Sequence, residues 1–339
     1  MLSISEIAFR TGYSTATVSR ALDSRFRDKV RPETREKILS FCGEVGYRPN
    51  FSARALSRGN TGTVGIVVPW IEAVTDSPTY GPLLGHLMDE LKKIHRSLTL
   101  IPVVRDDGKS IHEKVLEAFQ SSQVDAFLSM AAFLNTEILS AMRARNFPLV
   151  SFSMSSDLVQ HLPGSIHCRI DSAPAIKSLF EHLRPYERIA LLGVKSNSTR
   201  HEELAAMRQL DYFPIERGNF FFRATSLAAY EAVMQNWECL RQYQAIVCFN
   251  DQIAYGVCRA LQTKGLTPGK DIAVTGFDDL EQKDPKAFIT SISPPLQKLA
   301  ALCVTRLQQV LEKETDIPAE TSIPAELIIR KSSNLKIRS

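Results

Sequence analysis

Residues 3–22 read SISEIAFRTGYSTATVSRAL, in which two short helical patterns are joined at a glycine. Ser3 stands three residues before Glu6, a spacing typical of a capping box: the serine hydroxyl accepts a hydrogen bond from the Glu6 amide, and the glutamate carboxylate reaches back. A helix is therefore predicted to begin there, and Gly12 stands where the chain must turn. The apolar side of this helix is expected to comprise Ile7 and Ala8.

The second helix is predicted to follow Ser14, whose hydroxyl can cap it, and to run over 15–22. Val18 and Leu22 lie four residues apart, so both can pack inward against the first helix. The opposite face carries small hydroxyl or methyl-bearing side chains and one guanidinium: Thr15, Ala16, Thr17, Ser19 and Arg20. Such a face suits the major groove of DNA, because a methyl group can touch thymine and arginine can pair with guanine.

Two roles are expected for the DNA-binding residues of this segment. Those that read bases are Thr15, Ala16 and Arg20. Those that hold phosphates are Thr17, Ser19 and Arg31, and Ser3 completes the set.

A third helix is predicted to begin at Pro32 and to end before Gly46, because proline is common at the first helical position and glycine just past the last. Its contribution to a small core is expected to come from Ile38, Leu39, Phe41, Cys42 and Val45. A unit of this size buries too little surface to be very stable alone.

Charge is distributed unevenly along the 339 residues. Residues 1–60 hold eleven Lys or Arg against six Asp or Glu, a net charge of +5, which leaves −1 for the rest of a chain whose total is +4. The basic end is also the end with the groove-facing pattern, as binding to phosphates requires. With 44% hydrophobic residues, the chain is long enough to bury a large core.

The cysteines and histidines form no recognisable ligand pattern. The six cysteines are scattered through apolar runs: Cys42, Cys168, Cys239, Cys248, Cys258 and Cys303. Without a Cys-x-x-Cys pair or a His-x-x-x-His spacing, we expect buried reduced thiols and no metal site. The sequence also has no signal-peptide pattern and no apolar run long enough to span a bilayer, so a soluble cytosolic protein is expected.

Enzyme motifs are missing from the sequence. Neither a Gly-x-Ser-x-Gly elbow nor a Gly-x-Gly-x-x-Gly loop occurs. The string GLTPGKD at 265–271 differs from a phosphate loop, because only three residues separate its glycines and an aspartate follows its lysine. We therefore expect a helix-to-strand turn there, no enzymatic activity and no cofactor.

Beyond residue 62, short apolar strands alternate with helices, a pattern typical of parallel sheets covered on both faces. Strands are predicted at 64–68, 98–104, 125–130, 149–152, 188–192, 245–249 and 272–276. Helices are predicted at 80–94, 111–121, 135–146, 172–183, 201–211, 226–240 and 251–264. The chain can cross back between the two sets of strands and helices in its last part. Three further elements are predicted there: a strand at 289–292, a helix from Leu296 and a strand at 326–330.

The chain is similar to the LacI/GalR family of bacterial transcription regulators. The matching strings are ISEIAFRTGYSTATVSRAL, RPETREKILSFCGEVGYRPNFSARAL and FNDQIAYGVCRALQTKGLTPGKDIAVTGFDD. The resemblance implies an N-terminal all-α helix-turn-helix headpiece with a hinge helix, followed by an α/β two-lobed sensor domain with Rossmann-like subdomains, like the periplasmic binding proteins. It also implies a homodimer on a near-palindromic operator.

On this basis the chain divides into a headpiece at 1–48, a hinge helix and linker at 49–61, and an effector-binding and dimerisation domain at 62–339. Its two subdomains are expected at about 62–162 plus 293–322, and at about 163–290 plus 323–332.

The hinge spans Asn50 to Arg58, too few residues for a stable isolated helix. The resemblance implies that it folds when two copies meet on DNA, with Leu56 wedged into a minor-groove step and Arg54 near the backbone. Asn50 and Ala53 belong to the same DNA-binding set. The alternative is a flexible linker with an incidental leucine.

An effector pocket is expected beyond the carboxyl ends of the strands. The resemblance implies that Asn250 and Asp278 hydrogen-bond the polar rim of a small effector. Asp251 is interpreted as a helix N-terminal carboxylate and Asp279 as a loop acid.

The sequence departs from the family at three places around this pocket. Glu203 stands where many members carry an arginine. Arg200 would take that place if the alignment shifts by three residues, about one helical turn. Trp70 and Tyr80 lie in a longer loop after the first strand, and they can stack on a sugar or base or simply pack. Phe220 begins a run of phenylalanines near a stacking position. These residues complete the expected effector set.

We expect a ligand-responsive DNA-binding regulator, with repression favoured over activation, in the cytoplasm and associated with the nucleoid. Its effector is expected to be a small polar molecule such as a carbohydrate or derivative. The alternative is a binding protein or enzyme of the same fold whose N-terminal helices mediate protein contacts. The sequence names neither the effector, the direction of its effect, the regulated genes, nor any assembly beyond the dimer.

Overall fold

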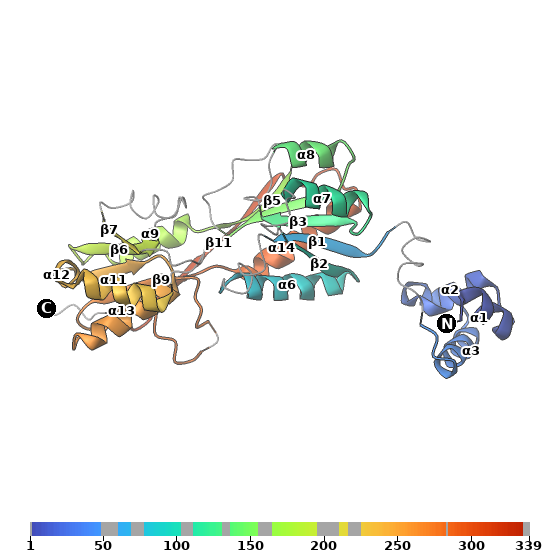
Figure 1. Ribbon diagram of the computed structural model, residues 1–339, viewed down its shortest axis with the longest axis horizontal. Helices are drawn as coiled ribbons and strands as arrows, with labels where there is room; N and C mark the ends of the chain where they lie inside the picture. The colour runs from blue at the N-terminus through green and yellow to red at the C-terminus, as the bar shows by residue number, and fades with distance from the viewer. Residues whose placement is uncertain are drawn as a thin grey trace. The chain divides into compact units, whose positions relative to one another are not determined.

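The computed structural model of the chain divides into two units, Met1–Gly62 and Thr63–Ser339 (Figure 1). It describes residues 2–48, 60–68, 78–102, 111–130, 136–154, 165–194, 210–215, 225–282 and 284–334. The expected hinge, with Asn50, Ala53, Arg54 and Leu56, lies outside the described residues.

The first unit contains the predicted pair of helices and the third helix. Its elements are α1 (Ile4–Thr11), α2 (Thr15–Leu22), the 3-10 helix η1 (Ser24–Lys29) and α3 (Pro32–Glu44). The turn between α1 and α2 occurs at Gly12, whose φ of 73° favours glycine. Ser3 Oγ accepts from the Glu6 amide at 3.2 Å, and Ser14 Oγ accepts from the Thr17 amide at 3.1 Å. Both predicted caps are therefore confirmed.

The reciprocal half of the capping box differs from the prediction. Glu6 Oε1 accepts a hydrogen bond from Arg10 at 2.8 Å, one helical turn further along α1. The carboxylate is therefore directed toward an i,i+4 ion pair and not back toward Ser3.

A small core holds the three helices together. Its buried members are Ile7, Ala8, Val18, Ala21, Val30, Ile38 and Cys42. The expectation for Leu39 and Val45 was wrong, because their side chains are 43% and 36% exposed. Ile38 and Cys42, four residues apart, are the buried residues of α3, and the predicted Phe41 is partly buried against the same core. Each further residue turns the side chain by about 100° around the helix, which directs Leu39 and Val45 outward.

The second unit contains two six-stranded sheets. The first has the order β11-β5-β4-β3-β1-β2 and is parallel throughout. Its strands are β1 (Thr63–Val68), β2 (Ser97–Pro102), β3 (Ala126–Met130), β4 (Leu149–Ser153), β5 (Ile166–Asp171) and β11 (Glu320–Pro324).

The second sheet has the order β12-β10-β9-β8-β6-β7 and is parallel except for the antiparallel pairing of β12 with β10. Its strands are β6 (Ile189–Val194), β7 (Asp211–Ile215), β8 (Ala245–Cys248), β9 (Ala273–Phe277), β10 (Thr290–Ser293) and β12 (Glu326–Ile328). The expected pair of Rossmann-like subdomains is therefore present.

The helices of the second unit end within three residues of the predicted ranges wherever those ranges are described, except that the single helix predicted at 226–240 is divided at Asn236 into two. They are α6 (Tyr80–Lys93), α7 (Ile111–Gln120), α8 (Thr136–Arg143), α9 (Ala173–His182), α11 (Ser226–Gln235), α12 (Trp237–Leu240), α13 (Asp251–Thr263) and α14 (Leu296–Leu311). The helix expected at 201–211 falls largely outside the described residues.

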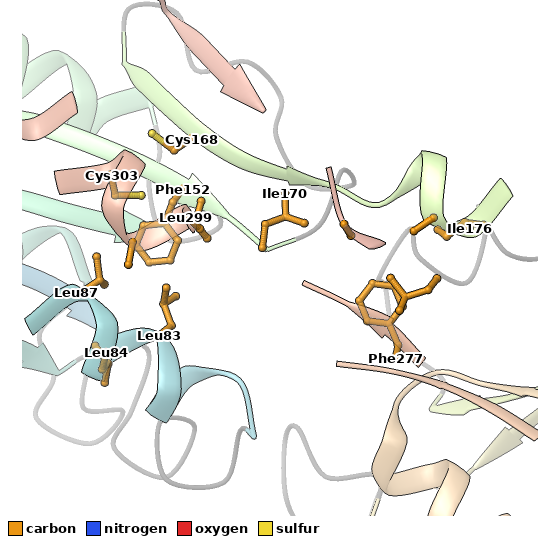
Figure 2. Packing of buried hydrophobic residues seen from close by; sticks show 14 of the residues in the cluster. Leu83, Leu84, Leu87, Phe152, Cys168, Ile170, Ile176, Phe277, Leu299 and Cys303 are labelled. Atoms are coloured by element: carbon orange, nitrogen blue, oxygen red, sulfur yellow. The ribbon is translucent and has the colours of Figure 1, made fainter. Parts of the chain in front are cut away.

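The largest core cluster joins α6, α14 and both sheets. Figure 2 shows Leu83 and Leu87 of α6 close to Phe152 of β4 and Leu299 of α14. The same cluster continues to Phe277 at the end of β9. Apolar contact between the sheets is thus part of one continuous core.

The boundary between the two sheets differs from the expected one. β5 pairs with β4 in the register Val150↔Ile166, so the chain leaves the first sheet near Ser172 and not at 162. β10 pairs with β9, which extends the second sheet to Ser293. β5 escaped prediction because its sequence, IHCRID, mixes polar with apolar residues. The final crossing, at the buried Ala325 between β11 and β12, lies close to the expected position.

All six cysteines are free thiols. Five are buried as expected, but Cys239 on the short helix α12 is exposed, so the expectation was wrong there. The raised pKa of the buried Cys248 and Cys258 thiols has its largest cause in desolvation.

We predict that Gly256→Ala destabilises the second unit. A Cβ at Gly256 would lie 2.6 Å from Ala229 Cβ and closer still to the Ser226 carbonyl oxygen, where α11 packs on α13. Such overpacking should lower the free energy of unfolding by about 2 kcal/mol, as measured by urea denaturation. Gly85→Ala, on α6 with open space around the new Cβ, is the control and should raise it by about 0.5–1 kcal/mol. Equal effects of the two substitutions would contradict this account of the packing.

Candidate functional site

The outer face of α2 is the first candidate. Thr15, Ala16, Ser19 and Arg20 are exposed, while Val18 behind them is fully buried. The helix is held in place at its other end by Arg35, whose Nε donates to the Ala21 carbonyl at 3.1 Å. The structure therefore brings the predicted groove-facing side chains together on one accessible surface.

The other predicted phosphate-binding residues, Thr17, Ser3 and Arg31, lie at or beside the N-terminal caps of the three helices. Thr17 is half-buried, and its hydroxyl lies 2.9 Å from Ser14 Oγ within the helix cap. Ser3 is exposed, with its oxygen occupied by the cap of α1. Arg31 is exposed at the N-cap position of α3 without a side-chain capping bond. Arg31 thus stands at the positive end of that helix.

The second candidate is the polar edge where β8 and β9 end. Asn250 is half-buried and caps α13, with its Oδ1 accepting from the Ile253 amide at 2.9 Å. The Asn250 Nδ2 group makes no hydrogen bond with the described residues. Asp278 follows β9, and its amide donates to the Ile292 carbonyl at 2.9 Å. Because β8 and β9 are adjacent parallel strands, these two predicted residues belong to one edge of the sheet.

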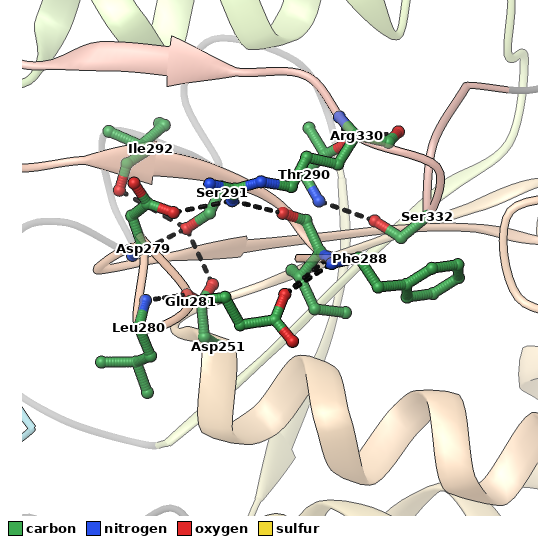
Figure 3. A network of polar contacts seen from close by, with 11 residues as sticks. Asp251, Asp279, Leu280, Glu281, Phe288, Thr290, Ser291, Ile292, Arg330 and Ser332 are labelled. Atoms are coloured by element: carbon green, nitrogen blue, oxygen red, sulfur yellow. Dashed lines mark hydrogen bonds and ion pairs between the residues drawn. The ribbon is translucent and has the colours of Figure 1, made fainter. Parts of the chain in front are cut away.

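Asp251 joins these two strand ends. Its carboxylate, only 1% exposed, accepts from Ser291 Oγ at 2.8 Å through Oδ1 and from the Leu280 amide at 2.8 Å through Oδ2 (Figure 3). Asp251 is the first residue of α13, as expected, but its carboxylate is directed into the protein and holds the chain after β9. The helix-terminus interpretation therefore described its position and missed its main contacts.

Asp279 is also more than a loop acid. It is buried and pairs with Arg330 at 2.6 Å between Oδ1 and the guanidinium. The same guanidinium donates to the Ile289 carbonyl at 2.8 Å. Asp278 and Asp279 have φ values of 96° and 51°, so two consecutive non-glycine residues occupy the left-handed region. Such a turn costs of order 1–3 kcal/mol per residue and persists only when its surroundings hold it.

Serine and threonine side chains extend this network along β10. Ser332 Oγ accepts from the Thr290 amide at 2.7 Å and donates to the Val274 carbonyl at 2.6 Å. Glu281 Oε2 accepts from the Phe288 amide at 2.6 Å (Figure 3). Sequence reasoning missed Ser291, Arg330 and Ser332. No local pattern marks which polar side chain, in a strand or just after one, binds another element of the sheet.

Burial raises the pKa of the Asp251 carboxyl to about 7. The largest cause is desolvation, and the neighbouring negative charges of Asp278 and Asp279 act in the same direction. The hydrogen bonds from Leu280 and Ser291 oppose the shift. Asp251 is therefore a buried acid that titrates near neutral pH.

Of the remaining predicted effector residues, the structure describes Tyr80 alone. Tyr80 is only 6% exposed at the start of α6, and desolvation raises the pKa of its hydroxyl. Its ring is packed and is not an open stacking surface in this structure. Trp70, Glu203 and Phe220 lie outside the described residues, as does Arg200.

A cavity of about 520 Å³ lies elsewhere, at the amino ends of β4 and β5. Its lining is largely apolar, and its rim carries Arg143 and Lys313 together with Glu314. Side chains of both charges therefore line the cavity, near the carboxyl ends of α8 and α14. It is separate from the polar edge of the second sheet.

None of the described helices is both long and apolar enough to cross a membrane. Within the same parts of the chain, no cluster of three or more His, Cys, Asp or Glu side chains is placed to hold a metal ion.

Comparisons with known proteins match both units. Residues 3–50 match the family described as bacterial regulatory proteins, lacI family, and residues 182–333 match the periplasmic binding protein-like domain. The HTH-type transcriptional regulator RegA of Clostridium saccharobutylicum is 26% identical over 341 residues, covering 98% of this chain and 99% of that protein.

Solved structures are similar to the chain in fold. The crystal structure of the lac repressor dimer bound to operator and the anti-inducer ONPF aligns with a TM-score of 0.78 and 21% identity, over 98% of this chain and 99% of that one. The complex of the transcriptional regulator CelR with cellobiose aligns with a TM-score of 0.62 and 19% identity, over 98% and 100% of the two chains.

We predict a specific pH dependence of stability from Asp251. Between its ordinary pKa of 3.8 and the folded value of about 7, the folded state binds a proton that the unfolded state has released. The contribution of Asp251 to stability is therefore largest below about pH 4 and is lost as the pH rises to 7. From pH 5 to pH 8 the loss should be about 2 to 3 kcal/mol.

Urea denaturation of the wild type and Asp251→Asn at both pH values measures this contribution. The variant should gain stability relative to the wild type by about that amount on going from pH 5 to pH 8. Asp316→Asn, at an exposed position, is the control. A constant difference between Asp251→Asn and the wild type at the two pH values would show that Asp251 is ionised in both states.

Proposed function

We propose that the chain is a member of the LacI family of bacterial transcriptional regulators, a repressor that releases or binds its operator in response to a small polar effector. The observation that carries this proposal is the exposed face of α2, with Thr15, Ala16 and Arg20 presented by a capped helix-turn-helix unit. We further propose that the protein has no enzymatic activity and that it lies in the cytoplasm, associated with the nucleoid.

The proposed DNA interface combines base reading with phosphate binding. Arg20 pairs with a guanine, while the methyl groups of Thr15 and Ala16 contact thymine. Phosphates are bound by the hydroxyls of Thr17, Ser19 and Ser3 and by the Arg31 guanidinium. The caps of α1 and α2 support this assignment, because they fix the helices before DNA arrives.

The proposed operator complex is a homodimer on a near-palindromic site. One headpiece buries few side chains and reads only a few base pairs, so two copies are needed for useful specificity. We propose that residues 49–61 form the hinge between the headpiece and the 62–339 domain, with Leu56 inserted into the minor groove and Asn50, Ala53 and Arg54 beside it. The hinge is proposed from the sequence of residues 49–61.

The proposed effector is a carbohydrate or a derivative of one. The similar structures described above carry the anti-inducer ONPF and cellobiose. In this chain, the amide group of Asn250 and the carboxylate of Asp278 form a donor and an acceptor at one sheet edge, a combination suited to hydroxyl groups. Trp70, Tyr80, Glu203 and Phe220 complete the proposed set, with the burial of Tyr80 favouring a packing role.

The function is tested by mobility shift on the DNA upstream of the chain's own gene, with salt increased stepwise. Specific binding whose affinity falls steeply with salt is expected, because Lys and Arg release counterions from the phosphates. A thermal-shift screen of mono- and disaccharides then identifies the effector, since a ligand of the folded state raises the melting temperature. Absence of specific DNA binding would favour the alternative, a binding protein whose N-terminal helices contact other proteins.

We predict that Arg20→Ala relaxes operator specificity. Loss of a bidentate contact should weaken binding to the operator by about 1 to 3 kcal/mol and remove preference at one base pair in each half-site. The measurement is the dissociation constant for the operator and for its single-base variants. Lys270→Ala, an exposed cation in the second unit, is the control. Equal weakening on all sequences would make Arg20 a phosphate contact.

A further prediction separates effector sensing from DNA binding. Asn250→Ser keeps an oxygen to cap α13 but removes the amide donor, and Asp278→Asn keeps a residue that tolerates its left-handed backbone. Both variants should bind the operator as the wild type does and lose the response to the sugar found in the screen. An unchanged response would remove these residues from the effector site, and loss of operator binding through misfolding would assign them a structural role.

A further inference from the structure

We infer that Ser291 and Asp251 position the effector-binding edge, by holding the turn at Asp278, Asp279 and Leu280 in the conformation that receives the ligand. The inference rests on the proposed function, because it concerns the same edge of the second sheet. Neither residue is assigned a contact with the effector. Both act through the backbone of the turn.

The turn needs an external support. Asp278 and Asp279 both have positive φ values, which side chains other than glycine rarely adopt. Two of its three amides are bound by this pair: the Asp279 amide donates to Ser291 Oγ at 3.0 Å, and the Leu280 amide donates to Asp251 Oδ2 at 2.8 Å. The third, of Asp278, donates to the Ile292 carbonyl of β10. The left-handed backbone is thus held at every residue.

Ser291 connects the two supports. Its hydroxyl accepts from the turn and donates to Asp251 Oδ1 at 2.8 Å, so a single fully buried oxygen links β10, α13 and the turn. Loss of that hydroxyl leaves a buried amide and a buried carboxylate oxygen without this partner, an arrangement that costs more than the bond itself. The turn is then expected to relax.

The Asp251 carboxylate packs tightly against the backbone of β9. A Cβ at Gly276 would collide with Asp251 Oδ1, so the carboxylate lies directly against the strand that leads into the turn. Asp251 also follows Asn250 in the chain, and Asn250 caps the same helix. One carboxylate therefore fixes the position of both predicted rim residues relative to each other.

Arg330 supports the turn from a third element. It follows β12 and pairs with Asp279 at 2.6 Å, so the Asp279 side chain is held while its amide is held by Ser291. The carboxylates of Asp251 and Asp279 are both engaged within the protein. Asp278 is half-buried, and it is the acid of the turn that the proposed function places at the effector.

Ser291→Ala tests the inference, with Ser332→Ala as a matched control. Both serines are fully buried, and the hydroxyl of each makes two bridging hydrogen bonds, but Ser332 binds Thr290 and Val274 and does not contact the turn. Both variants should lower the melting temperature. Only Ser291→Ala should weaken binding of the sugars that shift the wild type, by about tenfold, with operator affinity in the absence of sugar unchanged. Ser291→Thr, which restores a hydroxyl, should recover the affinity.

A second readout needs no ligand. Hydrogen exchange of the Asp279 and Leu280 amides should become about tenfold faster in Ser291→Ala and stay at the wild-type rate in Ser332→Ala. Equal exchange or equal sugar affinity in the two variants would overturn the inference. If no sugar in the screen binds the wild type, the carbohydrate proposal fails, and the exchange rates alone decide whether Ser291 holds the turn.

Discussion

Parallel strand pairing is the constraint on which the rest of the second unit depends. Because each parallel strand must begin at the same edge as its neighbour, a crossover returns the chain, and the carboxyl ends of adjacent strands meet. β8 and β9 pair in the register Ala245↔Ala273. Asn250 and Asp278 are consequently brought to one edge although the whole of α13 separates them in the chain. A polar site arises there without any local sequence signal connecting the two residues.

Elements with a strong local signal could be predicted from the sequence. The apolar runs of β1, β4 and β8 and the capped starts of α1, α2 and α13 are written in consecutive residues. β5 and β11 carry no such run. They pair in the register Glu320↔His167, supported by the Arg169–Glu320 ion pair at 2.6 Å, and these partners are distant in sequence. Pattern reading misses a strand whose stability comes from its neighbours.

The candidate site follows the same rule. Asn250 and Asp278 could be predicted to lie at the sheet edge because each follows an apolar strand, and their contact with the effector is what the family resemblance implies. Ser291 and Arg330, which bind the adjacent Asp251 and Asp279, come from β10 and from the segment after β12, and only the sheet order brings them near. The periodicity of α13 places Asp251 in its first turn but leaves open which way the carboxylate points. That direction depends on a serine contributed by another strand.

The distribution of the thiols has a practical consequence for following this protein in solution. Five of the six cysteines are buried, and Cys239 on α12 alone is accessible. Buried thiols react slowly, because their thiolate form is disfavoured and reagents cannot reach them. A maleimide dye should therefore attach to the natural chain at Cys239 first. Helix α12 thus carries an intrinsic labelling position, at which fluorescence can report on the second unit without any engineered residue.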